Sequence, residues 1–381
     1  MSGLNDTPKA NRIHISFFGL RNAGKSTLVN AFAGQAIAIV SDVAGTTTDP
    51  VSKAMEILPL GPCILTDTAG LDDVGELGEM RVRKSFDVLA TTDIAVWVAG
   101  DVGDGDSRET DAFRRFSLEC ARRGVAVLEY HRDESVEDFR KRVAVVKIVE
   151  QTKPIVGDLV KEGDAVLLVC PQDGSAPKGR LILPQQQVIR EILDAGGIAQ
   201  VCQPKSLAAS ADAYASCKFA ITDSQAFAEV DAALPEEMPL TSFSILFARA
   251  KGELDVYCEG LAALKSLKDG DVVLIAEGCS HHRQCGDIGT VKLPKAISRM
   301  TGKRLEFRFC SGGDFPFDAY MPKLVVQCGG CMLTRREMLR RIAMAQEAGV
   351  PITNYGLVLA AANGIDADPV TCMVRRRPKK A

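Results

Sequence analysis

The sequence predicts an α/β protein of three consecutive domains, and three observations support this fold class. A glycine-rich loop near the N-terminus lies between a strand-like segment and a helix-like segment. Strand-like and helix-like segments alternate through the middle of the chain, as they do in domains with mostly parallel sheets. Two more strand-like segments toward the C-terminus are each followed by cysteines. We expect the domains at residues 1–154, 155–252 and 253–381.

Length and composition favour a globular cytoplasmic protein. Of the 381 residues 46% are hydrophobic, which is enough for several cores. The net charge is −3, so we expect neither nucleic acid nor a membrane surface as a partner. Residues 1–12 do not have the pattern of a signal peptide, and no apolar run approaches the roughly 18 residues that span a bilayer. In a reducing compartment the twelve cysteines are not expected to form a disulfide framework.

The glycine-rich loop has the spacing of a phosphate-binding P-loop. Residues 13–18 read as a strand, residues 19–26 form the loop Gly-Leu-Arg-Asn-Ala-Gly-Lys-Ser, and a helical pattern follows. Its glycines allow backbone N–H groups to surround phosphate oxygens at the helix N-terminus. Lys25 can reach the β and γ phosphates, and the Ser26 hydroxyl can bind Mg²⁺. The expected nucleotide-binding residues of this loop are Gly19, Asn22, Ala23, Gly24, Lys25, Ser26 and Thr27.

A second nucleotide motif follows about forty residues later. An apolar run ends in Asp67-Thr-Ala-Gly70, which would place a carboxylate near Mg²⁺ and a flexible amide near the γ-phosphate. Between the two motifs, residues 44–49 read Ala-Gly-Thr-Thr-Thr-Asp. This ordered set resembles GTPases of the TrmE and Era type. The resemblance implies that Thr47 closes over Mg²⁺.

The same resemblance implies a catalytic set and a second cation. The catalytic residues would be Lys25, Thr47, Asp67 and Gly70. In the resembling GTPases the residue at the place of Asn22 helps to hold a K⁺ ion, which supplies the positive charge of an arginine finger. Leu71 stands where Ras-like proteins carry a glutamine that orients the attacking water. We therefore expect slow hydrolysis of GTP that K⁺ stimulates.

The base-recognition motif is eroded. Residues 125–128 resemble the strand before Asn-Lys-x-Asp, yet the following sequence is Tyr-His-Arg-Asp, in which only Asp133 is retained. Its carboxylate can accept hydrogen bonds from guanine N1 and N2. The next twenty or so residues are too few for the final helix, strand and loop of a complete GTPase domain. The sequence predicts a C-terminally shortened GTPase domain, with weakened guanine specificity and hydrolysis.

The middle region, residues 155–252, predicts a small α/β layer. Residues 165–170 and 219–222 read as strands, and a helical stretch ends near Leu193. No cluster of chemically active residues occurs there, so we assign the region to structure or self-association.

The C-terminal region carries soft-metal ligands at the ends of two predicted strands. Residues 272–276 lead to Cys279-Ser-His281, and residues 323–326 lead to Cys328-Gly-Gly-Cys331. The two glycines permit a backbone path that brings both thiolates to one metal, and a helix beginning near Thr334 would favour a thiolate-rich anion.

The residues alone leave the metal open. Three cysteines and a histidine would suit tetrahedral Zn²⁺, while three thiolates and a weaker ligand would suit a 4Fe-4S cluster with one exchangeable position. A thioredoxin-like redox pair would leave Cys279 and His281 unexplained.

Taken together, the motifs resemble the HydF family of FeFe-hydrogenase maturation GTPases. The resemblance extends over nearly the whole chain and is carried by residues 19–26, 67–73, 75–78, 176–185, 221–227, 277–282, 328–333 and 351–356. It implies a GTPase domain, a dimerisation domain and a domain that binds a 4Fe-4S cluster through Cys279, Cys328 and Cys331, with His281 or an external ligand at the fourth iron. Gln327 departs from the family, since many members have histidine there.

The resemblance also implies partners. The protein would be a homodimer that carries a diiron precursor, assembled with the radical-SAM maturases HydE and HydG, to the FeFe-hydrogenase apo-protein. Its cofactors would be the 4Fe-4S cluster, GTP, Mg²⁺ and K⁺. One alternative is a regulatory GTPase whose three cysteines and histidine hold a structural zinc. An RNA-associated GTPase is disfavoured by the acidic balance of charge.

Overall fold

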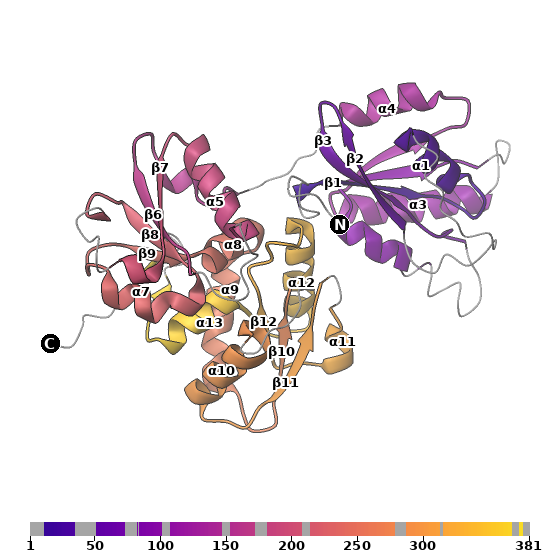
Figure 1. The fold of residues 1–381 in the computed structure, drawn as a ribbon. Helices are drawn as coiled ribbons and strands as arrows, with labels where there is room; N and C mark the ends of the chain where they lie inside the picture. Colours follow the sequence, from indigo (N-terminus) through magenta and orange to yellow (C-terminus); the bar gives the residue numbers. More distant parts are fainter. Residues whose placement is uncertain are drawn as a thin grey trace. The chain divides into compact units, whose positions relative to one another are not determined.

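The computed structural model describes residues 11–34, 51–72, 82, 84–100, 107–146, 153–171, 181–207, 214–278, 287–312, 315–367 and 373–375. The chain folds into two compact units, residues 1–150 and 151–381 (Figure 1). Within the described ranges, no helix has both the length and the apolar composition needed to cross a bilayer.

The first unit is a five-stranded sheet with helices on both faces. The strand order is β2-β3-β1-β4-β5, and all neighbours are parallel except β2 and β3. The strands are β1 (Ile13–Phe18), β2 (Val51–Ile57), β3 (Gly61–Asp67), β4 (Ile94–Val98) and β5 (Ala126–Tyr130). The helices are α1 (Lys25–Ala33), α3 (Ser107–Arg122), α4 (Val136–Ala144) and the short η2 (Leu89–Thr91). The interior strand β4 lies between β1 and β5 and is buried throughout, which explains its unbroken apolar sequence.

After β5, the described part of the first unit continues into one short helix, α4. The nine-residue helix α4 follows β5 directly and packs against α1, with the Phe139 ring 5.9 Å from the Phe32 ring. Arg140 donates from Nη2 to the Phe32 carbonyl, and Ser135 Oγ caps the helix by accepting from Asp138 N. Among the described residues of this unit, no strand follows β5. One helix therefore closes the α1 face of the sheet in place of a longer C-terminal segment.

The second unit contains two sheets. The first has the order β14-β15-β9-β8-β6-β7. Strands β7, β6, β8 and β9 are parallel to one another, and β15 is antiparallel to both of its neighbours, β9 and β14. Its strands are β6 (Ala165–Val169), β7 (Ile198–Cys202), β8 (Phe219–Thr222), β9 (Leu240–Ser242), β14 (Asp366–Ala367) and β15 (Val374–Arg375). The associated helices are η3 (Gly157–Leu159), α5 (Leu183–Asp194), η4 (Pro204–Ser206), η5 (Ser224–Ala226), α7 (Phe227–Ala233) and α8 (Phe243–Lys251).

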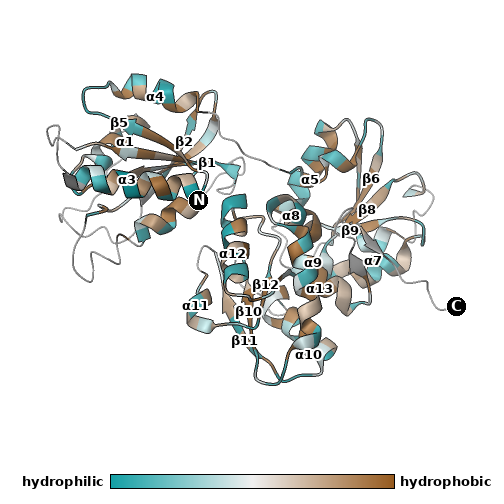
Figure 2. Ribbon diagram, turned by 180° about the vertical axis from the view of Figure 1, so that it is seen from behind, coloured by the Kyte–Doolittle hydropathy of each residue, from teal (hydrophilic) through white to brown (hydrophobic). Residues whose placement is uncertain are grey.

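The second sheet of this unit is fully parallel, with the order β11-β10-β12-β13. Its strands are β10 (Val272–Ala276), β11 (Glu306–Cys310), β12 (Leu324–Gln327) and β13 (Ile352–Asn354). Its helices are α9 (Leu254–Ala262), η6 (Ala263–Ser266), η7 (Ile288–Lys292), α10 (Leu293–Thr301), α11 (Phe317–Tyr320), α12 (Arg335–Glu347) and α13 (Tyr355–Ala362). Figure 2 shows hydrophobic colour along the strands and hydrophilic colour along α3 and α12.

One hydrophobic core joins the two sheets of the second unit. It includes Leu168 of the first sheet, Val325 of the second and Phe247 of α8, all of them buried. The expected boundary between residues 252 and 253 falls inside this unit, between α8 and α9. The short strands β14 and β15 come from the C-terminal region but extend the sheet of the middle region. Division of the second unit into two domains stays a prediction.

Candidate functional site

The loop between β1 and α1 has the backbone that a phosphate cradle requires. Gly19, Asn22 and Gly24 have φ values of 152°, 60° and 90°, and asparagine is one of the few residues with a side chain that tolerate this region. A Cβ on Gly19 would lie 2.6 Å from the carbonyl oxygen of Val98, so only glycine fits. Ala23 is buried beneath the loop, while Thr27 is exposed in the first turn of α1.

Lys25 is folded over this loop. Its Nζ donates to the carbonyl oxygens of Leu20, over 2.7 Å, and Gly19, over 3.3 Å. The residue is only 7% exposed, and these contacts hold its ammonium group at the N-terminus of α1. A positive side chain and a helix N-terminus together favour a phosphate.

Ser26 and Asp67, the two expected Mg²⁺ ligands among the described residues, are hydrogen-bonded to each other beside this loop. Ser26 Oγ donates to Asp67 Oδ2, and the buried Asp67 Oδ1 has no hydrogen-bond partner among the described residues. Burial raises the pKa of the Asp67 carboxyl, while the Ser26 hydrogen bond and nearby Lys25 and Lys53 oppose that rise. A hydroxyl beside an unpaired carboxylate oxygen is a suitable hard-donor pair for Mg²⁺. Thr47, the third expected ligand, lies outside the described residues.

The loop after β3 lies directly on the phosphate cradle. Leu71 N donates to Gly19 O over 3.2 Å, and Arg21 N donates to Asp72 Oδ1 over 2.6 Å. A Cβ on Gly70 would lie 2.8 Å from Arg21 N. Gly70 therefore lies against the phosphate-binding loop, and its expected role near the γ-phosphate stays a prediction.

The segment after β5 also contacts the phosphate-binding loop, through Arg132, which the sequence motif does not predict. Asp133 is exposed in the turn after β5. The Arg132 guanidinium lies against Gly24, with Nη2 3.3 Å from the place a Cβ would take. The sequence signal for Arg132 was its positive charge, which stands one position after the place of the lysine in Asn-Lys-x-Asp. His131 is a surface residue near Glu129.

The strands that lead to the two cysteine motifs end side by side at the carboxyl edge of the parallel sheet. Strands β10 and β12 are neighbours, and Ala276 pairs with Gln327 where both strands end. Directly beyond this pair, Gly278 N donates to Cys328 Sγ over 2.9 Å, and Gly330 N donates to the same sulfur over 3.4 Å. Within the described ranges no group of three or more His, Cys, Asp or Glu side chains is arranged around a metal position. Cys279 and His281 lie outside those ranges.

Two glycines leave room for this arrangement. Gly330 has a φ of 68°, and a Cβ on it would lie 2.3 Å from Met338 Sδ. A Cβ on Gly278 would lie 2.9 Å from Leu333 Cγ and 3.3 Å from Cys328 Sγ. The Cys-Gly-Gly-Cys loop thus has the tight backbone path that the sequence predicts.

The surroundings of Cys328 suit a ligating sulfur. Burial raises the pKa of its thiol, and the Gly330 and Gly278 amides and the more distant Arg341 oppose that rise. A bound metal ion would remove the thiol proton outright. Amide hydrogen bonds to sulfur are among the features that adjust thiolate-ligated iron-sulfur centres. The Cys328 sulfur, which accepts from two backbone amides, is therefore suited to such a centre.

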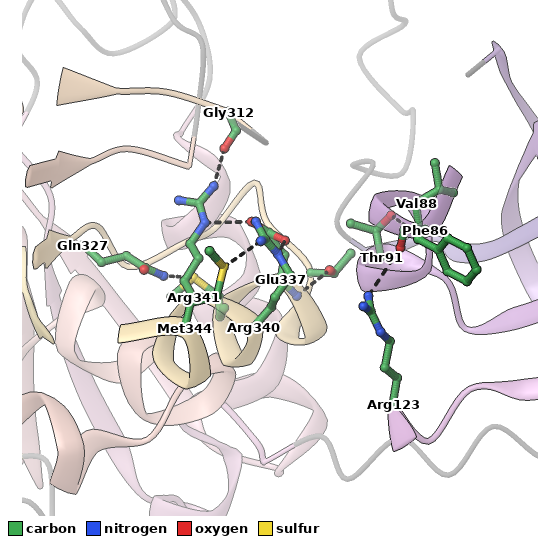
Figure 3. Close-up of polar contacts among 12 residues, drawn as sticks. Phe86, Val88, Thr91, Arg123, Gly312, Gln327, Glu337, Arg340, Arg341 and Met344 are labelled. Carbon is green, nitrogen blue, oxygen red and sulfur yellow. Dashed lines mark hydrogen bonds and ion pairs between the residues drawn. The ribbon is translucent and has the colours of Figure 1, made fainter. Parts of the chain in front are cut away.

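Gln327, next to Cys328, faces the opposite side of the sheet. Its side chain is fully buried and donates from Nε2 to Met338 Sδ over 2.7 Å (Figure 3). Figure 3 also shows Glu337 of α12 bound to Arg341, whose Nη2 donates to Gly312 O over 2.7 Å. This network fixes α12 behind the cysteine loop, and Gln327 belongs to it rather than to the ligand set.

Three family models match the chain. The model described as the hydrogen maturase F dimerization domain matches residues 155–252, and the hydrogen maturase F tetramerization domain matches residues 255–368. Together they cover more than half of the chain. The chain belongs to the hydrogen maturase F family. A third model, a 50S ribosome-binding GTPase, matches residues 14–128 of this family member.

The chain spans about a fifth of the length of the curated relatives that it matches. The tRNA modification GTPase MnmE of Dichelobacter nodosus is 42% identical over 105 residues, which are 27% of this chain and 22% of that protein. MnmE of Endomicrobium trichonymphae is 36% identical over 102 residues, 26% of this chain and 22% of that protein. An Era structure from Aquifex aeolicus aligns with 78% of this chain and 92% of its own at 15% identity, with a TM-score of 0.27.

The three family models and the MnmE alignments confirm the predicted P-loop GTPase domain and the hydrogen maturase F family. The GTPase model and the MnmE alignments indicate a GTPase domain in the first unit, which implies binding of GTP and Mg²⁺. Both C-terminal family models indicate oligomerization. The sequence predicted self-association only for the middle region, whereas the second oligomerization model covers the region with the cysteine motifs.

Proposed function

We propose that this chain is a scaffold and carrier for FeFe-hydrogenase maturation, holding a 4Fe-4S cluster in its second unit and GTP in its first. The observation that carries the proposal is the hydrogen bond from Gly278 N to Cys328 Sγ. It places the residue immediately before Cys279 against a cysteine of the other motif. The proposed ligands are Cys279, Cys328 and Cys331, with His281 or an external ligand at the fourth iron.

A cluster that the protein does not fully ligate can act as a carrier of the diiron precursor. A cluster with one exchangeable position can hold a diiron precursor through a bridging ligand and release it, whereas a site closed by four cysteines cannot do so as easily. The precursor is cargo, supplied with the radical-SAM maturases HydE and HydG and delivered to the FeFe-hydrogenase apo-protein. Gly278 and Gly330 supply the amides that stabilise the Cys328 thiolate.

In the first unit, the proposed activity is slow, K⁺-stimulated hydrolysis of GTP. Lys25 and the backbone amides of the cradle bind the phosphates, and Ser26 and Asp67, with Thr47, hold Mg²⁺. Gly70 faces the γ-phosphate, and the Asn22 side chain contributes to a K⁺ site. Asp133 is the proposed acceptor for the guanine base.

We also propose that the chain is a homodimer formed through strand β7. This strand is the edge of its sheet and exposes Ile198 and Val201, which are 53% and 47% accessible. An edge strand with apolar side chains can pair with a second copy. The region that contains it matches the dimerization model.

The test is reconstitution with iron and sulfide under strictly anaerobic conditions, followed by EPR and by analysis of iron, sulfide and zinc. We expect a reduced 4Fe-4S signal in the natural protein and its loss in Cys328→Ser. Cys258→Ser is the matched control, since Cys258 is a half-buried cysteine of α9 outside both motifs. One zinc per chain without a cluster would refute the carrier and favour a regulatory GTPase with a structural zinc site.

A further inference from the structure

Lys251 reaches from the end of α8 into the Cys-Gly-Gly-Cys loop. Its Nζ donates to the carbonyl oxygens of Leu333, over 2.8 Å, Gly330, over 3.2 Å, and Cys331, over 3.2 Å. One of its acceptors is therefore the carbonyl of a proposed ligand. Lys251 lies in the region matched by the dimerization model, and its three acceptors lie in the region matched by the tetramerization model.

Three carbonyl acceptors around Nζ match the charged form of this lysine. An ammonium group has three N–H donors and no acceptor, which matches three carbonyl acceptors, whereas a neutral amine has two donors. The Phe247 ring lies 5.6 Å from Nζ, and its π face also favours a cation. A full positive charge is thus held beside the cysteine loop.

A second basic residue ties the same elements together in the opposite direction. Arg335, the first residue of α12, donates from Nη1 to Ala250 O over 2.8 Å and to Gly252 O over 3.3 Å. Its Nη2 lies 3.3 Å from Glu253 Oε1. Lys251 therefore binds the loop from α8, and Arg335 binds the end of α8 from α12. These two ties keep the ammonium of Lys251 in place relative to the loop.

We propose that Lys251 is a positioning residue of the cluster site, which fixes the loop around Cys331 and makes the cluster easier to reduce. This inference rests on the proposed function. Reduction adds a negative charge to the cluster, and a fixed positive charge in a partly buried position stabilises the reduced form more than the oxidised form. Net charge and surrounding contacts are among the features that set the potentials of iron-sulfur centres.

The experiment uses the full-length chain, reconstituted anaerobically, with iron content and an EPR-monitored redox titration as readouts. Lys251→Gln removes the charge but keeps a donor, while Lys251→Arg keeps the charge. Lys303→Gln is the matched control, because it makes the same change of charge at an exposed residue of the same unit. We expect a more negative potential in Lys251→Gln, a potential near that of the natural protein in Lys251→Arg, and no shift in Lys303→Gln.

The other outcomes are also decisive. Loss of the cluster from Lys251→Gln but not from Lys251→Arg would support positioning by the charge. Natural potential and iron content in Lys251→Gln would overturn the inference, and so would equal loss of the cluster from the Gln and Arg variants. If the natural protein itself takes up no cluster, the proposed function fails, and that result is visible before any variant is compared.

Discussion

Gly278 and Cys328 lie 50 positions apart in the sequence, yet the amide of the first donates to the sulfur of the second over 2.9 Å. The contact exists because β10 and β12 are adjacent parallel strands that end at the same edge. It also requires glycine, because a Cβ at position 278 would lie 2.9 Å from Leu333 Cγ.

The first prediction follows from this crowding. Gly278→Ala is expected to push Leu333 and the Cys328 sulfur away, lowering the iron retained after anaerobic reconstitution and destabilising the unit by about 1–3 kcal/mol. Iron per chain and thermal unfolding are the measurements. Gly157→Ala is the control, since its added Cβ would meet only ordinary contacts of 3.6 Å and beyond. Full iron content in Gly278→Ala would show that the loop can move without loss of the site.

The second prediction concerns Asp67 and Mg²⁺. Burial raises the pKa of this carboxyl, so its ionised form costs stability in the protein without metal, and that cost grows as pH rises through the raised pKa. Without Mg²⁺, Asp67→Asn should therefore unfold at the same temperature as the natural protein or higher near neutral pH. With Mg²⁺ and GTP, the natural protein should gain stability that Asp67→Asn does not gain.

The raised pKa of Asp67 also sets the direction in which Mg²⁺ binding changes with pH. Because the proton and Mg²⁺ compete for one carboxylate, Mg²⁺ binding should weaken as pH falls through the raised pKa. Thermal unfolding across pH, with and without Mg²⁺ and GTP, measures both effects. An equal metal-dependent gain in Asp67→Asn and the natural protein would show that Asp67 is not a ligand.

Much of this fold was predictable because buried parallel strands have distinctive sequences. Residues 272–276 form an unbroken apolar run, and they make the buried strand β10. Strand β7 was missed, since an edge strand with exposed Ile198 and Val201 shows no regular apolar alternation. The two-residue strands β14 and β15 are too short to leave any pattern, and they join a sheet that begins some 200 residues earlier.

Part of the candidate site was predictable in the same way. Neighbouring strands of one parallel sheet end at the same edge, so the approach of the segments that lead to the two cysteine motifs could be expected. Lys251 was not, because it lies 80 positions before Cys331 and meets the loop only through the packing of α8. Arg132 was not predicted, because it stands at the variable position of Asn-Lys-x-Asp. Its contact with Gly24 depends on the position of its guanidinium in the fold and not on the motif.

The third prediction tests the dimer edge. A lysine at position 201 would place a charge on β7, and charged side chains on edge strands prevent pairing between copies. We expect Val201→Lys to weaken dimerization at least tenfold, which corresponds to about 1.4 kcal/mol. Light scattering after size-exclusion chromatography over a concentration series measures this. Leu118→Lys, at an exposed apolar residue of α3, is the control, and equal dimerization of both variants would place the interface elsewhere.

The fourth prediction concerns Asn22 and K⁺, and the backbone decides which variant is informative. Asn22 has a φ of 60°, where alanine would add roughly 1–2 kcal/mol of strain, so Asn22→Ala would disturb the cradle as well as remove the side chain. Asn22→Gly removes the side-chain oxygen and accepts the same backbone. We expect the natural protein to hydrolyse GTP faster in K⁺ than in Na⁺, and Asn22→Gly to lose this difference while its affinity for GTP changes little. Equal rates of the natural protein in the two salts would mean that no K⁺ acts in hydrolysis, and a retained K⁺ effect in Asn22→Gly would assign the ion to other ligands.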